Sequence, residues 1–414
     1  MMKNWDKKVN LMARQKEINF LLSQDLESPS GLGRYRPMAK ELAKRGFTVR
    51  IIALHADYGH LMNRSQIIDG VEVHYVSQMH VLKRENTTSY FRWWQLPCVI
   101  LKATNRIYRK VMEYNPDYII VCKPHPMNGF PGIWAAKRTG AKLIVDCDDY
   151  EKESNHYTNS LQKALVGFFE TYIPSKAWKV TTNTFFMRDK LIESGVQPEK
   201  IIYLSNGVDR DRFSNVNPNE VERLRQELSL SGKKVVLYIG SLNLSNHPVD
   251  MLLKAFVLVK EKVPEARLLI VGGGKDLDKL RNLAQDLQIA QSVIFTGRVQ
   301  SELAPLYYSV ADVSVDPADD SPASSGRAPL KIFESWAMGV PVVTSDVGDR
   351  KMLANLRWGP IQLARFSPID LSFALLDQIQ KPKSKDMRPD NEAPFFWDKL
   401  IEDFDKTLFE SEQL

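Results

Sequence analysis

Lys331 and Glu334 are the two residues whose types and spacing most directly suggest chemistry. They lie three positions apart in residues 329–343 (PLKIFESWAMGVPVV), so on a helix their side chains share one face. A cation in the first turn of a helix, beside backbone N–H groups without helical partners, suits a diphosphate. A carboxylate one turn later can accept two hydrogen bonds from ribose hydroxyls. An ion pair on the surface of an amphipathic helix has the same spacing, so both interpretations stay open at this point.

Two glycine-rich turns are further candidates, because glycine lets the backbone approach a ligand closely. They lie in residues 28–35 (SPSGLGRY) and 271–275 (VGGGK). The residues of interest in them are Gly31, Gly33, Arg34, Gly272 and Gly274. Each turn follows a predicted strand and opens a predicted helix, whose first N–H groups can bind an anion. The first turn lacks the full Gly-x-Gly-x-x-Gly spacing and the acidic ribose-binding residue, which argues against a nicotinamide cofactor. A plain strand–helix connection is the alternative for both turns.

Residues 90–110 combine aromatic and basic side chains. The stretch begins YFRWW and continues with Lys102, Arg106, Arg109 and Lys110 at steps of three and four residues. A basic, aromatic-rich helix can lie on an anionic membrane surface. A helix that packs on the core with a solvated basic face has the same pattern, and aromatic rings can also stack on a polysaccharide.

The elements that must position these residues are predicted from hydrophobic periodicity. Short apolar runs alternate with helical patterns in both halves of the chain, which indicates parallel α/β sheets. We predict strands over residues 18–22, 49–54, 72–76, 118–121, 142–145, 179–182, 201–204, 235–238, 267–271, 293–296, 313–315 and 340–344. We predict helices over residues 37–44, 188–193, 248–262, 277–287, 331–338 and 395–410. Residues 211–219 are polar, include a proline and suit an interdomain connection.

Length and composition limit the class of protein. A chain of 414 residues is too long for one hydrophobic core and suits two domains. Only three cysteines occur, Cys98, Cys122 and Cys147, which argues against a disulfide framework and against a zinc site. The first residues do not resemble a signal peptide and no apolar run reaches the ~18 residues of a membrane span, so we expect a cytoplasmic protein. The net charge of +6 favours phosphate-bearing ligands or an anionic membrane surface, and no nucleic-acid-binding motif is present.

Residues 329–343 resemble the signature segment of the retaining glycosyltransferases of family 4, in which a helix glutamate precedes Ala-x-Gly-x-Pro-Val-Val. Other segments of the chain resemble the same family in the same order. They are residues 31–35 with 42–49, residues 205–209 with Phe213, residues 237–242, residues 271–274 and residues 295–299. Each piece is degenerate, but the ordered set is specific and spans nearly the whole chain.

The resemblance implies a GT-B fold, in which two Rossmann-like domains place their parallel sheets on either side of a cleft. Residues 1–213 would bind the acceptor, together with a crossover helix at about residues 391–414, and residues 214–390 would bind the nucleotide-sugar donor. No metal or other cofactor is implied, since positive side chains and helix ends stabilise the leaving diphosphate. The resemblance favours a UDP-sugar as donor, because the family often uses uracil nucleotides, and the acceptor would be a glycan or a lipid-linked acceptor.

The resemblance also assigns roles to residues of this chain. Glu334 would hold donor hydroxyls, and Lys331 would stabilise the diphosphate together with the turns at Gly31, Gly33, Arg34, Gly240 and Ser241. The base would be framed by Gly272, Gly274, Arg298 and Val299. Gly326, Arg327 and Leu330 belong to the same donor segment. Asp148 or Asp149, which follow the predicted strand over 142–145, would position or activate the acceptor hydroxyl, or else would cap the next helix; we do not interpret them as a metal site.

Three positions depart from the family pattern. Gly326 stands where a second glutamate is usual, and Ser241 and His247 stand where an arginine and a lysine usually bind the diphosphate. Lys331, Arg327 and Arg298 are the available replacements for the lost charge. An inactive nucleotide- or sugar-binding scaffold is therefore the main alternative to an active transferase. A nucleotide-sugar epimerase is a weaker one, because His247 is the only histidine placed near the donor.

Overall fold

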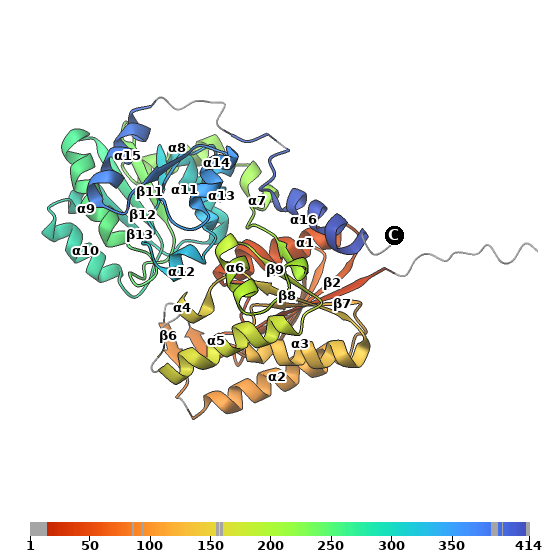
Figure 1. Cartoon of the computed structure of the whole chain (residues 1–414). Helices are drawn as coiled ribbons and strands as arrows, with labels where there is room; N and C mark the ends of the chain where they lie inside the picture. Colours follow the sequence, from red (N-terminus) through yellow and green to blue (C-terminus); the bar gives the residue numbers. More distant parts are fainter. Residues whose placement is uncertain are drawn as a thin grey trace, which may run out of the picture. The chain divides into compact units, whose positions relative to one another are not determined.

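The computed structural model describes residues 15–84, 87–92, 94–154, 157, 160–381, 388–390 and 392–410 (Figure 1). Its contacts divide the chain into two compact units. The first consists of Met1–Asp146 and Tyr172–Val180, and the second of Cys147–Thr171 and Thr181–Leu414. The predicted assignment of acceptor and donor binding to residues 1–213 and 214–390 stays a prediction.

An eight-stranded sheet runs through the N-terminal half of the chain. In spatial order its strands are β10 (Ile201–Tyr203), β9 (Lys179–Thr182), β8 (Lys142–Cys147), β7 (Tyr118–Cys122), β1 (Glu17–Leu22), β2 (Thr48–His55), β4 (Val71–Gln78) and β3 (Ser65–Ile68). Strand β3 is antiparallel to β4 and lies at the edge of the sheet. Every residue of β7 is buried, as expected for a strand covered on both faces.

A six-stranded parallel sheet lies in the second unit. Its spatial order is β13 (Val293–Gly297), β12 (Ala266–Val271), β11 (Lys234–Ile239), β14 (Val313–Asp316), β15 (Val342–Ser345) and β16 (Ile361–Ala364). A small hairpin, β5 (Val81–Arg84) with β6 (Thr87–Tyr90), stands apart from both sheets.

Helices supply the crossovers that parallel strands require. They are α1 (Arg36–Lys44), α2 (Leu96–Met112), α3 (Pro126–Thr139), α4 (Glu151–Ser154), α5 (Ser160–Ser175), α6 (Phe185–Glu193), α7 (Arg210–Ser214), α8 (Pro218–Glu227), α9 (Val249–Lys262), α10 (Leu277–Asp286), α11 (Ala304–Val310), α12 (Pro322–Ser325), α13 (Leu330–Ala337), α14 (Arg350–Leu356), α15 (Pro368–Gln380) and α16 (Trp397–Asp405). Short turns of other helix types are Gly31–Tyr35, Pro198–Lys200, Ala290–Ser292, Ser301–Leu303 and Lys406–Glu410.

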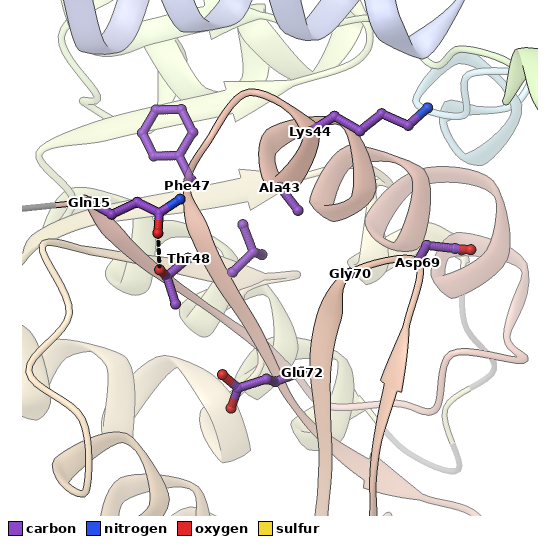
Figure 2. A pocket seen from close by; sticks show the side chains of 9 residues that line it. Gln15, Ala43, Lys44, Phe47, Thr48, Asp69, Gly70 and Glu72 are labelled. Atoms are coloured by element: carbon purple, nitrogen blue, oxygen red, sulfur yellow. Dashed lines mark hydrogen bonds between the residues drawn. The ribbon is translucent and has the colours of Figure 1, made fainter.

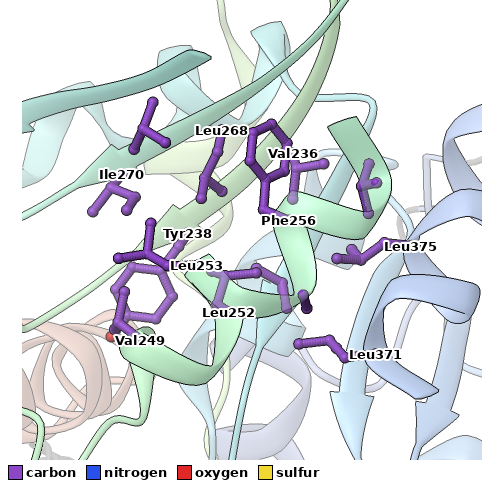
Figure 3. Packing of buried hydrophobic residues seen from close by; sticks show 14 of the residues in the cluster. Val236, Tyr238, Val249, Leu252, Leu253, Phe256, Leu268, Ile270, Leu371 and Leu375 are labelled. Carbon is purple, nitrogen blue, oxygen red and sulfur yellow. The ribbon is translucent and has the colours of Figure 1, made fainter. Parts of the chain in front are cut away.

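The second sheet is covered by apolar helix faces on both sides. On one side α9 and α15 pack against the strands, with Phe256 and Leu375 in a continuous buried cluster with Val236 (Figure 3). On the other side α8, α11 and α13 contribute to a separate cluster around Trp336. Burying a side chain such as Phe256 contributes about 1.5–3 kcal/mol. The two clusters fix the sheet and therefore the positions of the turns at its edge.

Both sheets have a topological switch point, where the strand order reverses. In the first sheet it lies between β1 and β7, and in the second between β11 and β14. Open α/β sheets bind ligands outside the carboxyl ends of the strands at such points. The turns after these four strands are therefore the places to look for a site.

The structure confirms most of the predicted strands and corrects several elements. The predicted strand over 340–344 begins only at Val342, because Pro341 has no N–H to donate to a ladder. The predicted helix over 395–410 begins at Trp397, because the preceding Phe396 is engaged in a β-bridge with Val208, and its regular α part ends at Asp405. The connection predicted over 211–219 is largely helical, since α7 and the start of α8 lie in it. The sequence analysis missed β3 and β16, which are short and partly polar.

A surface hollow of about 390 Å³ lies beside the first sheet (Figure 2). It lies at the other end of the strands from the turns that follow β1 and β7. It is lined by the end of α1 and the beginnings of β2 and β4, with Lys44, Asp69 and Glu72 among its side chains. These three side chains are paired with Glu41, Arg36 and Arg50, respectively. Because the beginnings of β2 and β4 line it, the hollow lies at the amino ends of the strands, away from the switch point.

Candidate active site

Three glycine turns interlock at the carboxyl ends of β11, β12 and β13. Gly240, Gly272 and Gly297 have φ angles of 153°, 143° and 74°, a region that favours glycine. The N–H of Gly240 donates to Val271 O at 2.9 Å, and the N–H of Gly272 donates to Gly297 O at 2.9 Å. A Cβ on Gly272 would collide with the carbonyl oxygen of Gly240. The backbone therefore forms a closely stacked edge at this end of the sheet.

Lys331 lies against this edge from the first turn of α13. The helix begins at Leu330, after Pro329, and has no side-chain cap for its first N–H groups. A Cβ on Gly240 would lie 3.4 Å from Lys331 Cε, and Lys331 Nζ lies 5.2 Å from the centre of the Tyr238 ring. The structure thus brings together the predicted cation, the predicted helix start and the predicted glycine turn.

Lys331 has a buried partner that the sequence analysis missed. Its Nζ donates to Asp316 Oδ1 at 2.8 Å, and Arg350 Nε donates to Asp316 Oδ2 at 2.9 Å. Burial alone would raise the pKa of Asp316, but Lys331 and Arg350 together hold it below its ordinary value. The Arg350 side chain is 3% exposed and that of Lys331 is 14% exposed. Lys331 is therefore the cation of this trio that a ligand can reach.

Glu334 lies one turn further along α13 and is held on two sides. Tyr308 donates from its hydroxyl to Glu334 Oε2 at 3.2 Å, and Arg212 NH2 lies 3.7 Å from Oε1. Burial raises the pKa of Glu334, and Arg212, Tyr308 and Lys331 oppose that effect. The sequence analysis missed both Arg212 and Tyr308, because they lie far from Glu334 in the chain.

The loop after β11 contains Ser241 and His247. They stand where the family that the sequence resembles usually has an arginine and a lysine. Ser241 supplies its carbonyl oxygen to the Tyr238 hydroxyl at 2.9 Å. Burial, followed by the charges of Lys331 and Arg327, lowers the pKa of His247 far below its ordinary value. His247 is therefore neutral and adds no positive charge, whereas the Arg327 guanidinium lies beside this loop and donates to Asn246 O at 2.9 Å.

The turn predicted to frame the base also lies at this edge. A Cβ on Gly273 would lie 2.9 Å from Arg298 Cγ, so the Arg298 side chain covers the turn. A Cβ on Gly274 would collide with Leu242 O, which accepts a hydrogen bond from Asp276 N–H. Val299, next to Arg298, packs against the cluster around Trp336. Arg298 is thus found beside the glycine turn with which it was grouped, whereas the contact of Val299 is with the cluster around Trp336.

The position of the missing second glutamate is filled by an aromatic side chain. A Cβ on Gly326 would lie 2.7 Å from Tyr150 Cβ and 3.3 Å from the Phe186 ring. The Tyr150 and Phe186 rings are 5.7 Å apart, centre to centre. A glutamate at this position would have to displace Tyr150. The glycine is therefore explained by the close packing of the Tyr150 side chain at this position.

Arg34 has a different partner from the one that we expected. It was assigned to the diphosphate, but its guanidinium makes a bidentate pair with Asp146, with Nε–Oδ2 and NH2–Oδ1 distances of 2.8 and 2.6 Å. Both side chains are almost fully buried. A Cβ on Gly31 would lie 2.7 Å from Asp25 O, which explains this glycine by packing, and Gly33 lies in the same helical turn. The pair fixes the first glycine turn to the end of β8.

The switch point of the first sheet holds polar residues that the sequence analysis did not select. Ser23 Oγ and His125 Nδ1 lie 2.7 Å apart, after β1 and at the start of α3. Asn128 donates to the carbonyl oxygens of Leu21, Cys122 and Lys123, and so ties the ends of β1 and β7 together. A histidine three residues after the end of a buried strand was the available signal.

Asp148 and Asp149 lie with Glu151 in one carboxylate cluster, whose oxygens are within 4.8 Å of one another. Nearby, Glu170 accepts from the backbone N–H groups of Glu151 and Lys152 at 2.5 and 3.0 Å. Burial and the charge of Glu151 raise the pKa of Glu170 to about 8. The arrangement suits a hydroxyl group or a cation, and the predicted acceptor role of Asp148 or Asp149 stays a prediction.

A doubly wound parallel sheet with stacked glycine turns, an uncapped helix start and an accessible lysine at its switch point belongs to the nucleotide-binding class of α/β folds. Comparison with known families agrees. Residues 30–207 match the description "Glycosyl transferase 4-like domain" and residues 233–377 match "Glycosyl transferases group 1". The chain belongs to the group 1 glycosyltransferases of the retaining family 4.

Individual relatives and solved structures are similar to this chain over different lengths. The GDP-mannose-dependent alpha-(1-6)-phosphatidylinositol monomannoside mannosyltransferase of Mycolicibacterium smegmatis is 35% identical over 51% of this chain and 54% of its own. The chain thus spans about half the length of the curated relatives that it matches first. Sucrose-phosphate synthase of Thermosynechococcus elongatus is similar with a TM-score of 0.72 and 16% identity, over 96% of this chain and 100% of its own. HepE of Anabaena, in complex with UDP and glucose, has a TM-score of 0.68 and 17% identity, over 94% and 98%.

These similarities confirm the predicted GT-B fold class with its two parallel α/β sheets. Among the helices that the structure describes, none combines the length and the apolar composition needed to cross a bilayer.

Proposed function

We propose that the protein is a retaining glycosyltransferase that moves a sugar from a nucleoside-diphosphate sugar to a glycan or glycolipid acceptor without a divalent ion. The observation that carries this proposal is the arrangement at the start of α13. There Lys331 lies against the Gly240 turn, and Glu334 follows one helical turn later. A reachable cation and uncapped N–H groups suit the leaving diphosphate, and a carboxylate beside them suits the donor hydroxyls.

Further residues take roles by their contacts with these groups. Asp316 and Arg350 hold Lys331, while Arg327 supplies positive charge on the neighbouring loop. The turn at Gly272 and Gly274, covered by Arg298, is placed to contact the base through its backbone. Leu330 is the first residue of α13, so its N–H is one of the groups that would bind the diphosphate.

The donor and the acceptor are proposed by class. The mannosyltransferase relative is GDP-mannose-dependent and its name specifies a phosphatidylinositol-linked acceptor, whereas the HepE structure contains UDP. A guanine or uracil nucleotide and a lipid-linked or polymeric glycan are therefore the first candidates. Asp148 and Asp149 are our candidates for contact with the acceptor hydroxyl, because hydroxyl groups donate readily to clustered carboxylates.

The proposal is tested with a panel of UDP-, GDP- and ADP-sugars in the presence and absence of EDTA. We expect one donor to raise the melting temperature and to be hydrolysed slowly to its nucleoside diphosphate, equally well with the chelator. Binding without release of nucleoside diphosphate, with any acceptor extract added, would instead support an inactive scaffold. That alternative is favoured by Gly326, where Tyr150 occupies the place of a usual glutamate. Activity that EDTA abolishes would contradict the metal-free mechanism.

Helix α2 supports a proposed contact with an anionic membrane surface. It packs inward through Ala103, Ile107 and Val111 and leaves the opposite face exposed. On or just before that face, Trp94 is 53% exposed and Leu101 is 69% exposed, with the exposed Lys102 and Arg109 alongside. Apolar side chains flanked by cations are the pattern of a helix that lies in a lipid interface.

Liposome flotation measures this contact. We expect the protein to float with vesicles that contain an anionic phospholipid and much less with purely zwitterionic ones, because Lys102 and Arg109 add an electrostatic attraction. Leu101→Glu is expected to reduce flotation severalfold. Phe373→Glu is the matched control, since Phe373 is 66% exposed on α15 of the second unit. Equal flotation of both variants and the parent protein would contradict the assignment to α2.

A further inference from the structure

Arg212 lies in α7, in the connection between β10 and β11, and its guanidinium is held in place. Its Nε and NH2 donate to the carbonyl oxygen of Ser301 at 3.2 and 2.7 Å. The guanidinium carbon also lies 5.0 Å from the centre of the Phe213 ring. The turn itself begins at Asp209, whose carboxylate accepts from Asp211 N–H at 3.1 Å. The guanidinium therefore has a fixed direction.

That direction is toward Glu334. Arg212 NH2 lies 3.7 Å from Glu334 Oε1, and the two side chains are 23% and 16% exposed. Tyr308 of α11 donates to the other carboxylate oxygen, and Lys331 is the further cation that acts on Glu334 from α13 itself. Since Arg212 and Tyr308 approach different oxygens, together they fix the plane of the carboxylate. The negative charge of Asp316 in β14 also acts on Tyr308 and favours its neutral hydroxyl.

We propose that Arg212 is a positioning residue, which keeps the Glu334 carboxylate ionised and oriented so that it can accept hydrogen bonds from donor hydroxyls. The inference rests on the proposed function, because it assigns the same role to Glu334. Burial favours the neutral acid and raises the pKa of Glu334, so an opposing cation is needed. Arg212 is suited to this because Ser301 O accepts from both Nε and NH2, which fixes the guanidinium with NH2 beside Glu334 Oε1.

The neighbouring Arg210 provides a matched control from the same turn. Its NH2 pairs with Asp398 of α16 at 3.0 Å, and its guanidinium lies 3.9 Å from the centre of the Phe396 ring. Substitution of Arg210 therefore weakens the attachment of α7 to the C-terminal segment and leaves the contact of Arg212 with Glu334 in place. A purely structural role of α7 would affect both variants alike.

The test compares Arg212→Gln, Arg212→Lys and Arg210→Gln by the pH dependence of kcat/KM for release of nucleoside diphosphate from the donor identified in the panel. Without Arg212 the pKa of Glu334 rises further, so the fraction of carboxylate falls first at acidic pH. We expect the acidic limb of Arg212→Gln to move up by about one pH unit, which is about a tenfold loss on that limb. Arg212→Lys should restore most of the shift, and Arg210→Gln should keep the parent profile.

A second measurement needs no turnover. In protein labelled with ¹³C at the glutamate carboxyl carbons, the Glu334 signal is assigned by its absence from Glu334→Gln. Its titration midpoint should rise in Arg212→Gln and stay unchanged in Arg210→Gln. An unchanged midpoint and an unchanged acidic limb would overturn the role of Arg212. Full activity of Glu334→Gln would instead overturn the role of Glu334 in the proposed function, so the two failures are distinguishable.

Discussion

Replacement of Glu334 by alanine is expected to abolish detectable sugar transfer while the fold stays intact. In the proposed function the carboxylate accepts hydrogen bonds from donor hydroxyls, and each hydrogen bond to a charged group contributes about 1.5–3 kcal/mol. Loss of two such bonds lowers kcat/KM by about 10²–10⁴-fold. The measurement is release of nucleoside diphosphate from the donor with and without acceptor.

The stability of this variant should change little. The Glu334 side chain is only 16% exposed, and this partial burial raises its pKa and disfavours the charged form. Arg212 keeps Ser301 O as a partner after the substitution. We therefore expect a change in the free energy of unfolding of no more than about 1 kcal/mol. Glu227→Ala, at an exposed ion pair with Arg223, is the control and should keep full activity. Near-normal turnover of Glu334→Ala would remove the central assignment.

Replacement of Gly272 by alanine is expected to destabilise the second unit and to abolish nucleotide binding. The residue has a φ of 143°, which an alanine adopts only with strain, and its Cβ would collide with Gly240 O. Backbone strain costs about 1–3 kcal/mol and overpacking a similar amount, so we expect a loss of about 2–6 kcal/mol. The separation of the turns would also move Gly240 away from Lys331. Urea denaturation and isothermal titration with nucleoside diphosphate measure the two effects.

Gly297→Ala separates the steric effect from the backbone strain. Gly297 also has a positive φ, 74°, but a Cβ there would meet no atom within 4 Å. Only the left-handed conformation is then penalised, by about 1–2 kcal/mol. If Gly272→Ala and Gly297→Ala were equally stable and both bound nucleotide, the close stacking of the turns would not be required for stability or for nucleotide binding.

Much of the fold was predictable because buried parallel strands have a simple sequence pattern. Runs such as residues 118–121 and 313–315 contain only apolar, aromatic or small residues, and sheet membership follows from them. Lys331 and the Gly240 turn could be placed together, since both follow or face carboxyl ends of strands in one sheet. Where the signal was short or polar, as in β16, the prediction failed.

The partners of the site residues could not be predicted, because they depend on side-chain packing between distant segments. Asp316 and Lys331 are separated by 15 positions, and Tyr150 fills the space beside Gly326 from a different part of the chain. Arg34 shows the same limit, since its motif suggests an anion site but its Nε and NH2 both donate to the buried Asp146. Asp316 itself had a usable signal, as a carboxylate that ends an otherwise uncharged, buried strand at a switch point.

The buried Asp316 gives Lys331 and Arg350 a counterion within the protein. Two cations and one carboxylate leave this trio with a net charge of +1, and Lys331 is already engaged at 2.8 Å before any donor arrives. A diphosphate that draws Lys331 away must compete with that contact, so small anions such as sulfate should gain little there. When the nucleoside diphosphate departs, Lys331 can form its ion pair with Asp316 again. The same carboxylate that restrains the entry of ligands would thereby ease the release of the product.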